Sequence, residues 1–384
     1  MSEHIQRALQ SRRIEERLGA VEALARLEPA EATPLLLQAL RDRSRYVAAQ
    51  AARVLGEQRN DEAVPEMVAH FCWLSEEGKV RDPGCRVRNE LAVAFGKLDD
   101  ARATDALFLG MRTVQVEQDG VALVDMATGL RGNCALALAQ LRPPGALYAL
   151  SLLLFDLIPT ESGFQWVEPT RAAAEALGHL GDPAGMVPLA LRLAGGIALR
   201  SDGPTAVAPG LSASWLPTAA PAVPPPSREQ IEPDLVVACM NAAVTLDPEQ
   251  AVPLVAPYLR ACRGWEVGDD EPGHGGARAY LCGSAALALA RTRRPEVLPL
   301  LRECLETGPD TALEAVAIAL GNLRSDEARA ALMEAASNSR ASVRAAAAAA
   351  LALFPDEEVL ALLRRLAQRD KAAKVREAAR RALP

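Results

Sequence analysis

A short alanine-rich segment recurs along this chain of 384 residues, and the repetition constrains the fold more than any other feature. The segment Val47-Ala-Ala-Gln-Ala-Ala-Arg-Val-Leu-Gly56 has small residues at helical spacing, where neighbouring helices approach closely. Clear copies lie at residues 87–96, 130–139, 170–178, 312–321 and 343–352, and weaker copies begin near Glu16, Val236, Leu281 and Val375. The shortest spacing between copies is about 31 residues, so the chain is predicted to contain about ten units.

Each unit is predicted to form two helices. The first helix is clearest at residues 34–40, 299–305 and 360–366, where Pro34 and Pro299 are typical of a helix start. The second helix is predicted to end at Gly56, Gly96, Gly178 or Gly321. One such pair cannot bury its apolar faces alone, whereas stacked pairs share one core.

The composition agrees with closely packed helices. Hydrophobic residues make up 50% of the chain but aromatic residues only 4%, so alanine, leucine and valine must form the core. We therefore predict an all-α fold, in which residues 1–384 form a single right-handed α-solenoid of about ten helical hairpins.

Residues 171–190 resemble a known repeat family. Their sequence, Arg-Ala-Ala-Ala-Glu-Ala-Leu-Gly-His-Leu-Gly-Asp-Pro-Ala-Gly-Met-Val-Pro-Leu-Ala, is similar to the HEAT-like repeat of the phycobilisome-lyase (PBS lyase) type. The resemblance extends in units over nearly the whole chain and implies a HEAT-like solenoid. Such repeats occur in chromophore lyases, DNA-repair glycosylases, transport adaptors and assembly scaffolds, so the resemblance implies a fold and leaves the activity open.

Five consecutive units carry extra residues between their two helices. These inserts are residues 75–85, 113–129, 156–168, 196–233 and 264–276. Because equivalent loops of a solenoid emerge along one edge, we expect them to form one composite surface, the insert ridge. The five inserts carry a net charge of −12, which leaves +5 for the rest of a chain whose total is −7. The insert ridge is therefore predicted to be acidic.

Tryptophan residues are concentrated in the inserts. Three of the four tryptophans lie within them, and Trp73 stands two residues before the first. Tryptophan is a frequent interface residue, although each ring can also fold back and cover its own loop. The candidate partner-binding residues are the aromatic Trp166, Trp215, Trp265 and Phe164 and the carboxylates Asp119, Glu161, Asp269, Asp270 and Glu271.

Two inserts have a recognisable local pattern. Alternating residues around Asp119-Gly120 predict a β-hairpin within residues 113–129. This hairpin either lies on the helices or offers a strand edge to a partner. Seven prolines between Pro204 and Pro226 predict an extended tether in the 196–233 insert.

No catalytic constellation is found in the sequence. The histidines, at positions 4, 70, 179 and 274, fall in different units without a nucleophile beside them. His70, Cys72 and Cys85 could supply three zinc ligands, but His70 and Cys72 are two residues apart on one helix and face different directions. The acidic run 269–271 near His274 is predicted to be a solvated turn. We therefore expect no catalytic residue, cofactor or metal, and the seven cysteines, which form no CxxC pair, are predicted to be reduced thiols.

Arginines recur one position after the repeat start. They are Arg88, Arg131, Arg171, Arg344 and Arg376. Such a ladder could follow the phosphates of a nucleic acid, or each arginine could brace the turn before its helix through an acidic or carbonyl partner. The second alternative is favoured because the neighbouring inner-face positions are mostly small and neutral.

The predicted function is a non-catalytic protein-interaction scaffold or adaptor whose insert ridge binds a protein partner, and the acidic residues of the ridge favour a basic partner. The alternatives are a nucleic-acid-binding protein and a lyase-subunit-like protein that binds an organic cofactor. The chain has no run of apolar residues long enough to span a membrane and no apolar segment typical of a secretory signal near its start, so a cytoplasmic location is expected.

Overall fold

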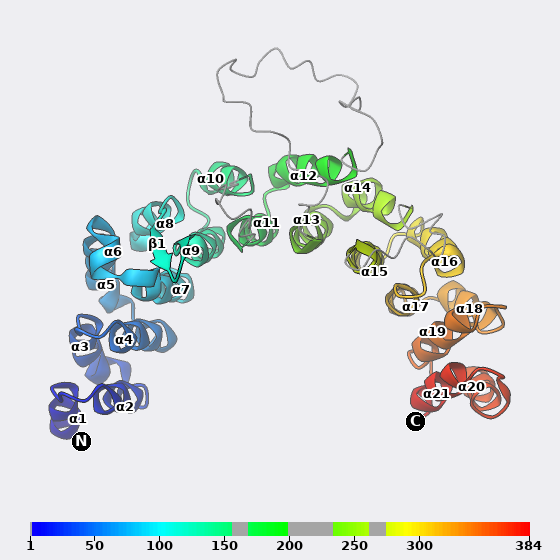
Figure 1. Cartoon of the computed structure of the whole chain (residues 1–384), viewed down its shortest axis with the longest axis horizontal. Helices are drawn as coiled ribbons and strands as arrows, with labels where there is room; N and C mark the ends of the chain where they lie inside the picture. The colour runs from blue at the N-terminus through cyan, green and yellow to red at the C-terminus, as the bar shows by residue number, and fades with distance from the viewer. Residues whose placement is uncertain (1, 156–167, 199–232, 261–273) are drawn as a thin grey trace, which may run out of the picture. The chain divides into compact units, whose positions relative to one another are not determined.

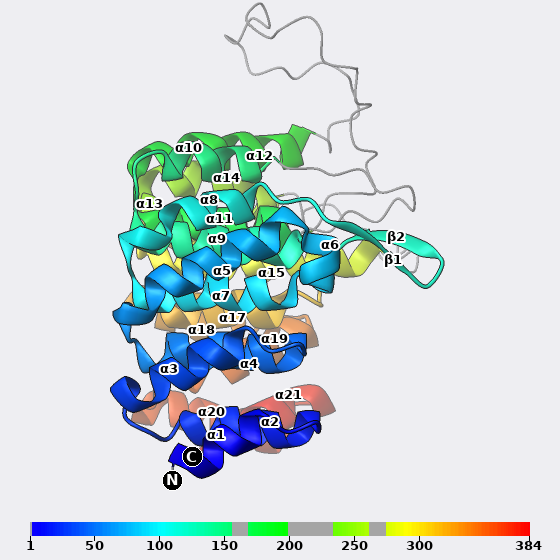
Figure 2. The same ribbon diagram turned by 90° about the vertical axis from the view of Figure 1, so that its left-hand side faces the viewer.

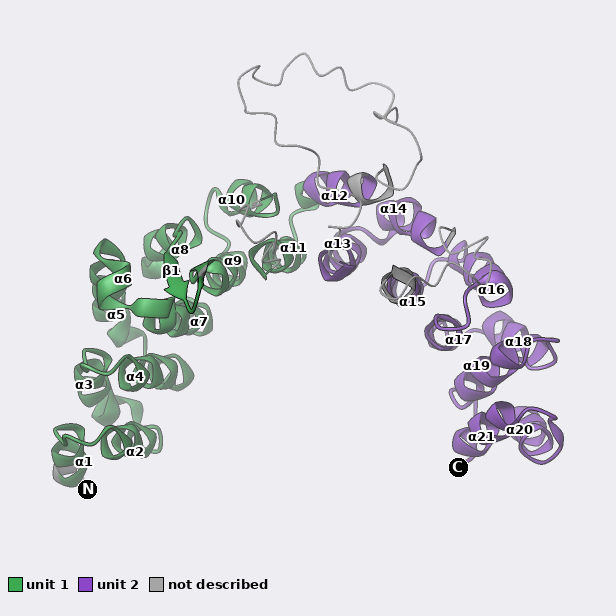
Figure 3. Ribbon diagram, viewed as in Figure 1, with its two compact units in different colours: residues 1–185 green, residues 186–384 purple. Residues whose placement is uncertain are grey.

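A computed structural model describes residues 2–155, 168–198, 233–260 and 274–384. Almost all of the regular structure in these ranges is α-helical, and the strands form a single two-stranded sheet. The chain divides into two compact units, Met1–Gly185 and Met186–Pro384 (Figure 3). Each unit is described here by itself.

Unit 1 contains five helical pairs, and in each the second helix runs beside the first (Figure 1). The pairs are α1 (Ser2–Leu9) with α2 (Ile14–Leu24), α3 (Pro29–Leu40) with α4 (Arg45–Gln58), α5 (Val64–Glu76) with α7 (Arg86–Leu98), α8 (Thr104–Met111) with α9 (Thr128–Leu141), and α10 (Ala146–Leu153) with α11 (Glu168–Leu180). The short helix α6 (Gly78–Arg81) lies between α5 and α7, and the strands β1 (Val116–Asp119) and β2 (Ala122–Asp125) lie between α8 and α9.

Unit 2 repeats the same arrangement five times. Its pairs are α12 (Met186–Ala198) with α13 (Pro233–Leu246), α14 (Pro248–Arg260) with α15 (His274–Thr292), α16 (Val297–Thr307) with α17 (Leu313–Asn322), α18 (Asp326–Ala335) with α19 (Ala341–Leu351), and α20 (Glu357–Arg369) with α21 (Ala373–Ala382). The ten pairs confirm the predicted all-α solenoid of helical hairpins.

The second helices stack on one another because their contact residues are small. In unit 1 they follow the order α2, α4, α7, α9, α11, and in unit 2 the order α13, α15, α17, α19, α21. Leu55, Leu91 and Leu138 are fully buried between them, together with alanines from each helix. The recurring alanine-rich segment of the sequence is therefore the spine of each unit.

The prediction that the second helices end at their glycines is wrong by one or two residues. Helix α4 continues past Gly56 to Gln58 and is followed by Arg59, which has a left-handed φ of 53°. A Cβ atom on Gly56 would lie 2.6 Å from the Cβ of Ala94, so this glycine permits the close approach of α4 and α7. Helices α7 and α11 likewise continue two residues past Gly96 and Gly178, and α17 continues one residue past Gly321.

The predicted helix start at Pro34 is also displaced. Helix α3 begins at Pro29, which occupies its first turn, and Pro34 lies inside it. Thr33 donates a hydrogen bond from its hydroxyl to the carbonyl oxygen of Pro29 over 2.7 Å. In the segment Pro34-Leu-Leu-Leu only Leu36 is buried, so the segment marks the middle of the helix, whereas Pro29 marks its beginning.

The described flanks place every insert between the two helices of one pair. Residues 75–85 include α6 and a short 3-10 turn, and residues 113–129 include the β-hairpin, so the predicted hairpin is confirmed. Most of the other three inserts lies outside the described residues, and the alignment of all five inserts along one edge stays a prediction. In the described part of the chain, no helix combines the length and apolar character needed to cross a membrane.

Candidate partner-binding surface

The β-hairpin extends beyond the ends of the neighbouring helices of unit 1 (Figure 2). Its strands pair with Val116 opposite Asp125 and Asp119 opposite Ala122. The two connecting residues are thus Gly120 and Val121, one position later than the turn predicted at Asp119-Gly120. Gly120 has a φ of 61°, the conformation that a two-residue hairpin loop requires at its first central position.

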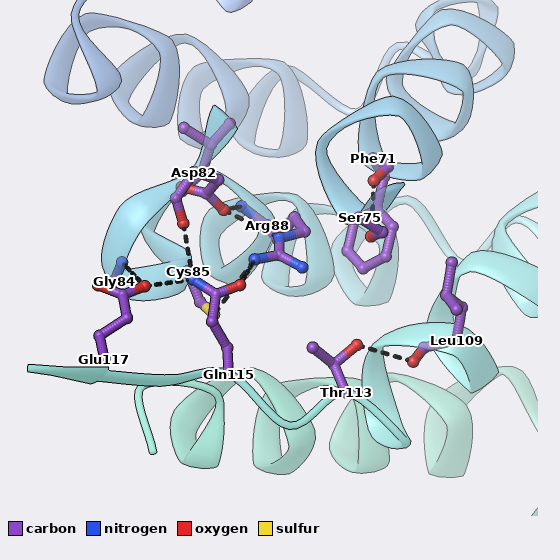
Figure 4. A network of polar contacts seen from close by, with 11 residues as sticks. Phe71, Ser75, Asp82, Gly84, Cys85, Arg88, Leu109, Thr113, Gln115 and Glu117 are labelled. Carbon is purple, nitrogen blue, oxygen red and sulfur yellow. Dashed lines mark hydrogen bonds and ion pairs between the residues drawn. The ribbon is translucent and has the colours of Figure 1, made fainter. Parts of the chain in front are cut away.

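A buried polar network fixes the base of the hairpin to α7 (Figure 4). The Arg88 guanidinium donates to the Asp82 carboxylate from Nε over 3.1 Å and also donates to the side-chain oxygen of Gln115, which precedes β1. Gln115 returns a hydrogen bond from its amide nitrogen to the carbonyl oxygen of Asp82 over 3.1 Å. All three residues are buried. The network therefore connects the first insert, through Asp82, to the second.

A second buried ion pair holds the end of β2. Asp125 accepts from the Arg131 guanidinium at 2.6 Å and from the backbone N–H groups of Gln115 and Ala127. Burial by itself raises the pKa of Asp125, but these three donors outweigh it and lower the pKa below its ordinary value. Asp125 is therefore a carboxylate at neutral pH.

The far part of the hairpin is exposed. Val121 is fully exposed and Leu123 is 60% exposed, and the candidate residue Asp119 is exposed beside them. The base of the hairpin is packed on the helices, and its outer half projects into solvent. That a partner adds to its strand edge stays a prediction. Sheets with unpaired strand edges and exposed apolar residues are suited to binding.

The arginines of the predicted ladder brace turns in most of the helical pairs. Arg344 donates to the carbonyl oxygens of Asn338 and Ser339 and forms a buried ion pair with Asp370 at 2.9 Å. Arg17, in the first helical pair, makes the same contacts: it donates to the carbonyl oxygens of Ser11 and Arg12 and to the carboxylate of Asp42. Arg88 forms an ion pair with Asp82, and Arg131 forms one with Asp125. Arg376 donates to the carbonyl oxygens of Asp370 and Lys371.

Arg171 differs from the other ladder members. Its carboxylate partners, Glu168 and Glu175, lie on its own helix. Arg88, Arg131 and Arg344 are buried, so their guanidinium groups do not form a track on the surface.

The other predicted partner-binding residues lie outside the described residues. They are Trp166, Trp215, Trp265, Phe164, Glu161, Asp269, Asp270 and Glu271. The acidic run 269–271 proposed as a solvated turn falls there as well, and His274 begins α15.

Trp73, the tryptophan outside the inserts, lines a groove on unit 1 that the sequence analysis missed. The groove has a volume of about 700 Å³ and lies between the turn after α3 and the helices α5 and α6. We call it the Trp73 groove; its walls include Arg41, Arg43, Arg45, His70, Trp73, Val80 and Arg81. The available signal was the run of arginines at positions 41, 43 and 45, which extends from the end of α3 to the first residue of α4.

The Trp73 ring is held in place by two neighbours. The ring of His70 stacks on it with centroids 5.4 Å apart, and the Arg81 guanidinium lies 4.5 Å from its centroid. Arg81 also donates to the carbonyl oxygen of Trp73 and to Glu76, each over 2.6 Å. The indole is nevertheless 47% exposed, so it forms a rigid apolar wall.

The His70, Cys72 and Cys85 trio is not assembled as a site. Cys85 is buried, and burial raises the pKa of its thiol to about 12. It accepts a hydrogen bond from Arg88, whereas His70 stacks on Trp73 and Cys72 is exposed. Among the described residues, no group of three or more histidine, cysteine, aspartate or glutamate side chains is placed to hold a metal ion.

Family models match the chain in three stretches. HEAT repeats match residues 2–80 and 310–384, and a PBS lyase HEAT-like repeat matches residues 281–307. With the ten helical pairs, these matches define the chain as an all-α solenoid that contains HEAT repeats. The predicted repeat type is thereby confirmed, in stretches that do not include residues 171–190.

Comparison with solved structures gives distant likenesses. Human deoxyhypusine hydroxylase in complex with glycerol is 16% identical, with 92% of this chain and 95% of that chain covered and a TM-score of 0.30. The complex of CpcE and CpcF of phycocyanin lyase from Nostoc sp. PCC7120 is 17% identical, with coverage of 91% and 92% and a TM-score of 0.35. Kap121p bound to Pho4p is 12% identical, with coverage of 99% and 41% and a TM-score of 0.47.

A search of curated protein sequences gives no match to this chain. Because the structural likenesses are low in both identity and TM-score, the assignment depends on this chain's own helices and on the repeat models.

Proposed function

We propose that this chain is a non-catalytic scaffold or adaptor that binds a protein partner along the insert ridge. The partner meets the exposed half of the β-hairpin and the acidic, tryptophan-containing inserts. In this proposal Trp166, Trp215, Trp265 and Phe164 supply apolar contacts, and Asp119, Glu161, Asp269, Asp270 and Glu271 attract a partner with a basic surface.

The observation that carries the proposal is the way the hairpin is held. Two buried ion pairs, Arg88 with Asp82 and Arg131 with Asp125, fix the hairpin base in one geometry. Buried ion pairs add little net stability because both charges lose their hydration, and their best-attested use is to specify one arrangement. Such pairs also brace short turns, as Arg344 with Asp370 does, but at the hairpin they additionally hold an exposed apolar tip in one position. A surface that presents Val121 to a partner benefits from this.

The first two inserts also contact each other. The backbone N–H of Gly84 donates to the Glu117 carboxylate over 2.9 Å, in addition to the contacts of Gln115. This is the arrangement that the insert ridge requires of its first two members. It supports extending the ridge to the three later inserts, which occupy the same position between paired helices.

The experiment is affinity capture with the full chain, followed by measurement of the dissociation constant of the captured partner. We expect Trp265→Ala to weaken binding about 30-fold, as for a residue that contributes about 2 kcal/mol at an interface. The matched control is Tyr148→Ala on α10, since Tyr148 is 70% exposed and belongs to no insert. Circular dichroism should show unchanged helical content for both variants.

Two results would oppose the proposal. Loss of helical content in Trp265→Ala would make that tryptophan a structural residue of its own loop. Equal partner binding by Trp265→Ala, Trp166→Ala and the wild-type chain would place the partner elsewhere.

The nucleic-acid alternative receives less support from the contacts of the Arg ladder. A phosphate-binding track needs accessible cations, but Arg344 is directed to Asp370 and to backbone carbonyl oxygens. A lyase-subunit-like role has no specific contact in its favour among the described residues. Mixing the chain with candidate tetrapyrroles and recording the absorbance spectrum tests that alternative directly.

A further inference from the structure

We infer that the Trp73 groove is a second binding surface, which shares Val80, Arg81 and Pro83 with the first insert but differs in charge from the acidic insert ridge. We infer that it takes an acidic segment of a partner protein with an apolar residue between carboxylates. The charges that line the groove favour such a ligand. The groove is bordered by Arg41, Arg43, Arg45 and Arg81, and Asp42 is the carboxylate among its lining residues.

Asp42 does not neutralise the groove. Its carboxylate accepts from the Arg17 guanidinium at 2.8 Å and from the backbone N–H of Ser44 at 2.7 Å. Both charges of the Arg17–Asp42 pair are largely buried. The charge of Asp42 is therefore balanced by Arg17 and does not cancel that of the groove arginines.

Three arginines at or beside the groove have no carboxylate partner among the described residues. Arg43 donates to the carbonyl oxygen of Arg12, and Arg45 and Arg86 lie 5.5 Å and 4.7 Å from the centroid of the exposed Tyr46 ring. All three arginines are exposed. Guanidinium groups hold carboxylates through paired hydrogen bonds, so this edge is suited to aspartate or glutamate side chains.

The opposite wall supplies an apolar contact. The Trp73 indole is 47% exposed and Val80, on α6, is 76% exposed, while Ala48 and Leu74 form part of the buried lining. An apolar side chain between the carboxylates of the ligand would cover these surfaces. The combination of aromatic wall and arginine edge is typical of the residues that dominate protein interfaces.

A nucleic acid fits this groove less well. Glu66 pairs with Arg41, and Glu76 and Glu77 pair with Arg81, so among the described residues only two arginines of the groove, Arg43 and Arg45, lack a carboxylate partner. Two such cations suit a short acidic segment better than a long chain of phosphates. The Trp73 ring already has His70 and Arg81 packed against it, which leaves little room for a stacked base.

The test is fluorescence anisotropy with a fluorescein-labelled peptide of six glutamates and one central leucine, added to the full chain. The variant Arg43→Glu with Arg45→Glu should weaken binding at least about tenfold, because two attractive charges become repulsive. The matched control, Arg26→Glu with Arg380→Glu, has the same change in net charge at two exposed positions outside the groove. It should change the affinity less than about twofold at 0.15 M salt.

A second variant distinguishes a loss of binding from a loss of folding. Val80→Glu adds a carboxylate at an exposed wall position and should also weaken peptide binding without lowering helical content. Trp265→Ala should keep wild-type affinity for the peptide, so failure of this inference and failure of the insert-ridge proposal give different results.

Three outcomes would overturn the inference. They are no peptide binding by the wild-type chain up to about 1 mM, equal binding by the groove variants and the wild-type chain, and tighter binding of a labelled oligothymidylate that the groove variants lose. The last result would make the groove a nucleic-acid site.

Discussion

Arg88 is the residue on which the geometry of the first two inserts depends. Its side chain is 1% exposed, and its Nε lies 3.1 Å from a carboxylate oxygen of Asp82, which is fully buried. Removing the guanidinium leaves a buried carboxylate with only backbone donors, from Val87 and Arg88. The residue therefore acts both on stability and on the placement of the hairpin.

We predict that Arg88→Met lowers the free energy of unfolding by about 3–5 kcal/mol, the usual effect of breaking a buried ion pair. Urea denaturation followed by circular dichroism measures the change. The double variant Arg88→Met with Asp82→Asn should recover part of the loss, because no buried charge remains unpaired. Arg45→Met, at an exposed position, should stay within about 0.5 kcal/mol of the wild-type chain. An equal effect of Arg88→Met and Arg45→Met would show that the pair has no such role.

His70 gives the chain a predictable pH dependence. Burial first, and then the charge of Arg41, lower the pKa of His70 below 6.5. The unfolded chain therefore takes up a proton at a higher pH than the folded chain, so stability falls as the pH decreases from 6.5 toward the lowered pKa. We predict that His70→Gln reduces this slope between pH 7 and pH 5, as followed by thermal melting at several pH values. An unchanged slope in the variant would contradict the assignment to His70.

At the scale of the helices, glycine has two different roles that one substitution separates. A Cβ on Gly56 would meet the Cβ of Ala94 at 2.6 Å, whereas a Cβ on Gly19 in α2 would have no neighbour within 4 Å. We predict that Gly56→Ala destabilises the chain by about 1–3 kcal/mol through overpacking. Gly19→Ala should stabilise it by about 0.5–1 kcal/mol through higher helix propensity. Thermal melting of both variants checks this, and destabilisation by the two changes alike would refute the close-approach explanation.

The helix ends show where prediction from sequence fails. The glycines at the ends of the alanine-rich copies suggested that the helices terminate there. A glycine is needed at such a position because the backbone lies close to the next helical pair, which no local pattern reveals. The helices end one or two residues later, and α4 and α7 are capped by non-glycine residues in left-handed conformation, Arg59 and Asp99. By contrast, the hairpin was predictable because alternation and an Asp-Gly pair are local signals.

At the scale of the whole molecule, the repeat period was sufficient to predict the number and type of helical pairs. Each helical pair contacts mainly its neighbours in the stack, so the sequence of one pair contains most of the information about the fold of that pair. The bracing role of the Arg ladder was likewise predictable from its register. The Trp73 groove was not, because its walls come from the end of α3, the start of α4 and the insert after α5, and only stacking brings them together.

In the proposed function the inserts, rather than the stacked second helices, contact the partner. Hydrogen exchange followed by mass spectrometry, on the full chain alone and with its captured partner, tests this claim most directly. The account predicts slower exchange on binding in peptides that cover residues 113–129 and the later inserts 156–168 and 264–276, with little change in α4, α7 and α9. Slower exchange confined to those second helices, with the insert peptides unaffected, would contradict it.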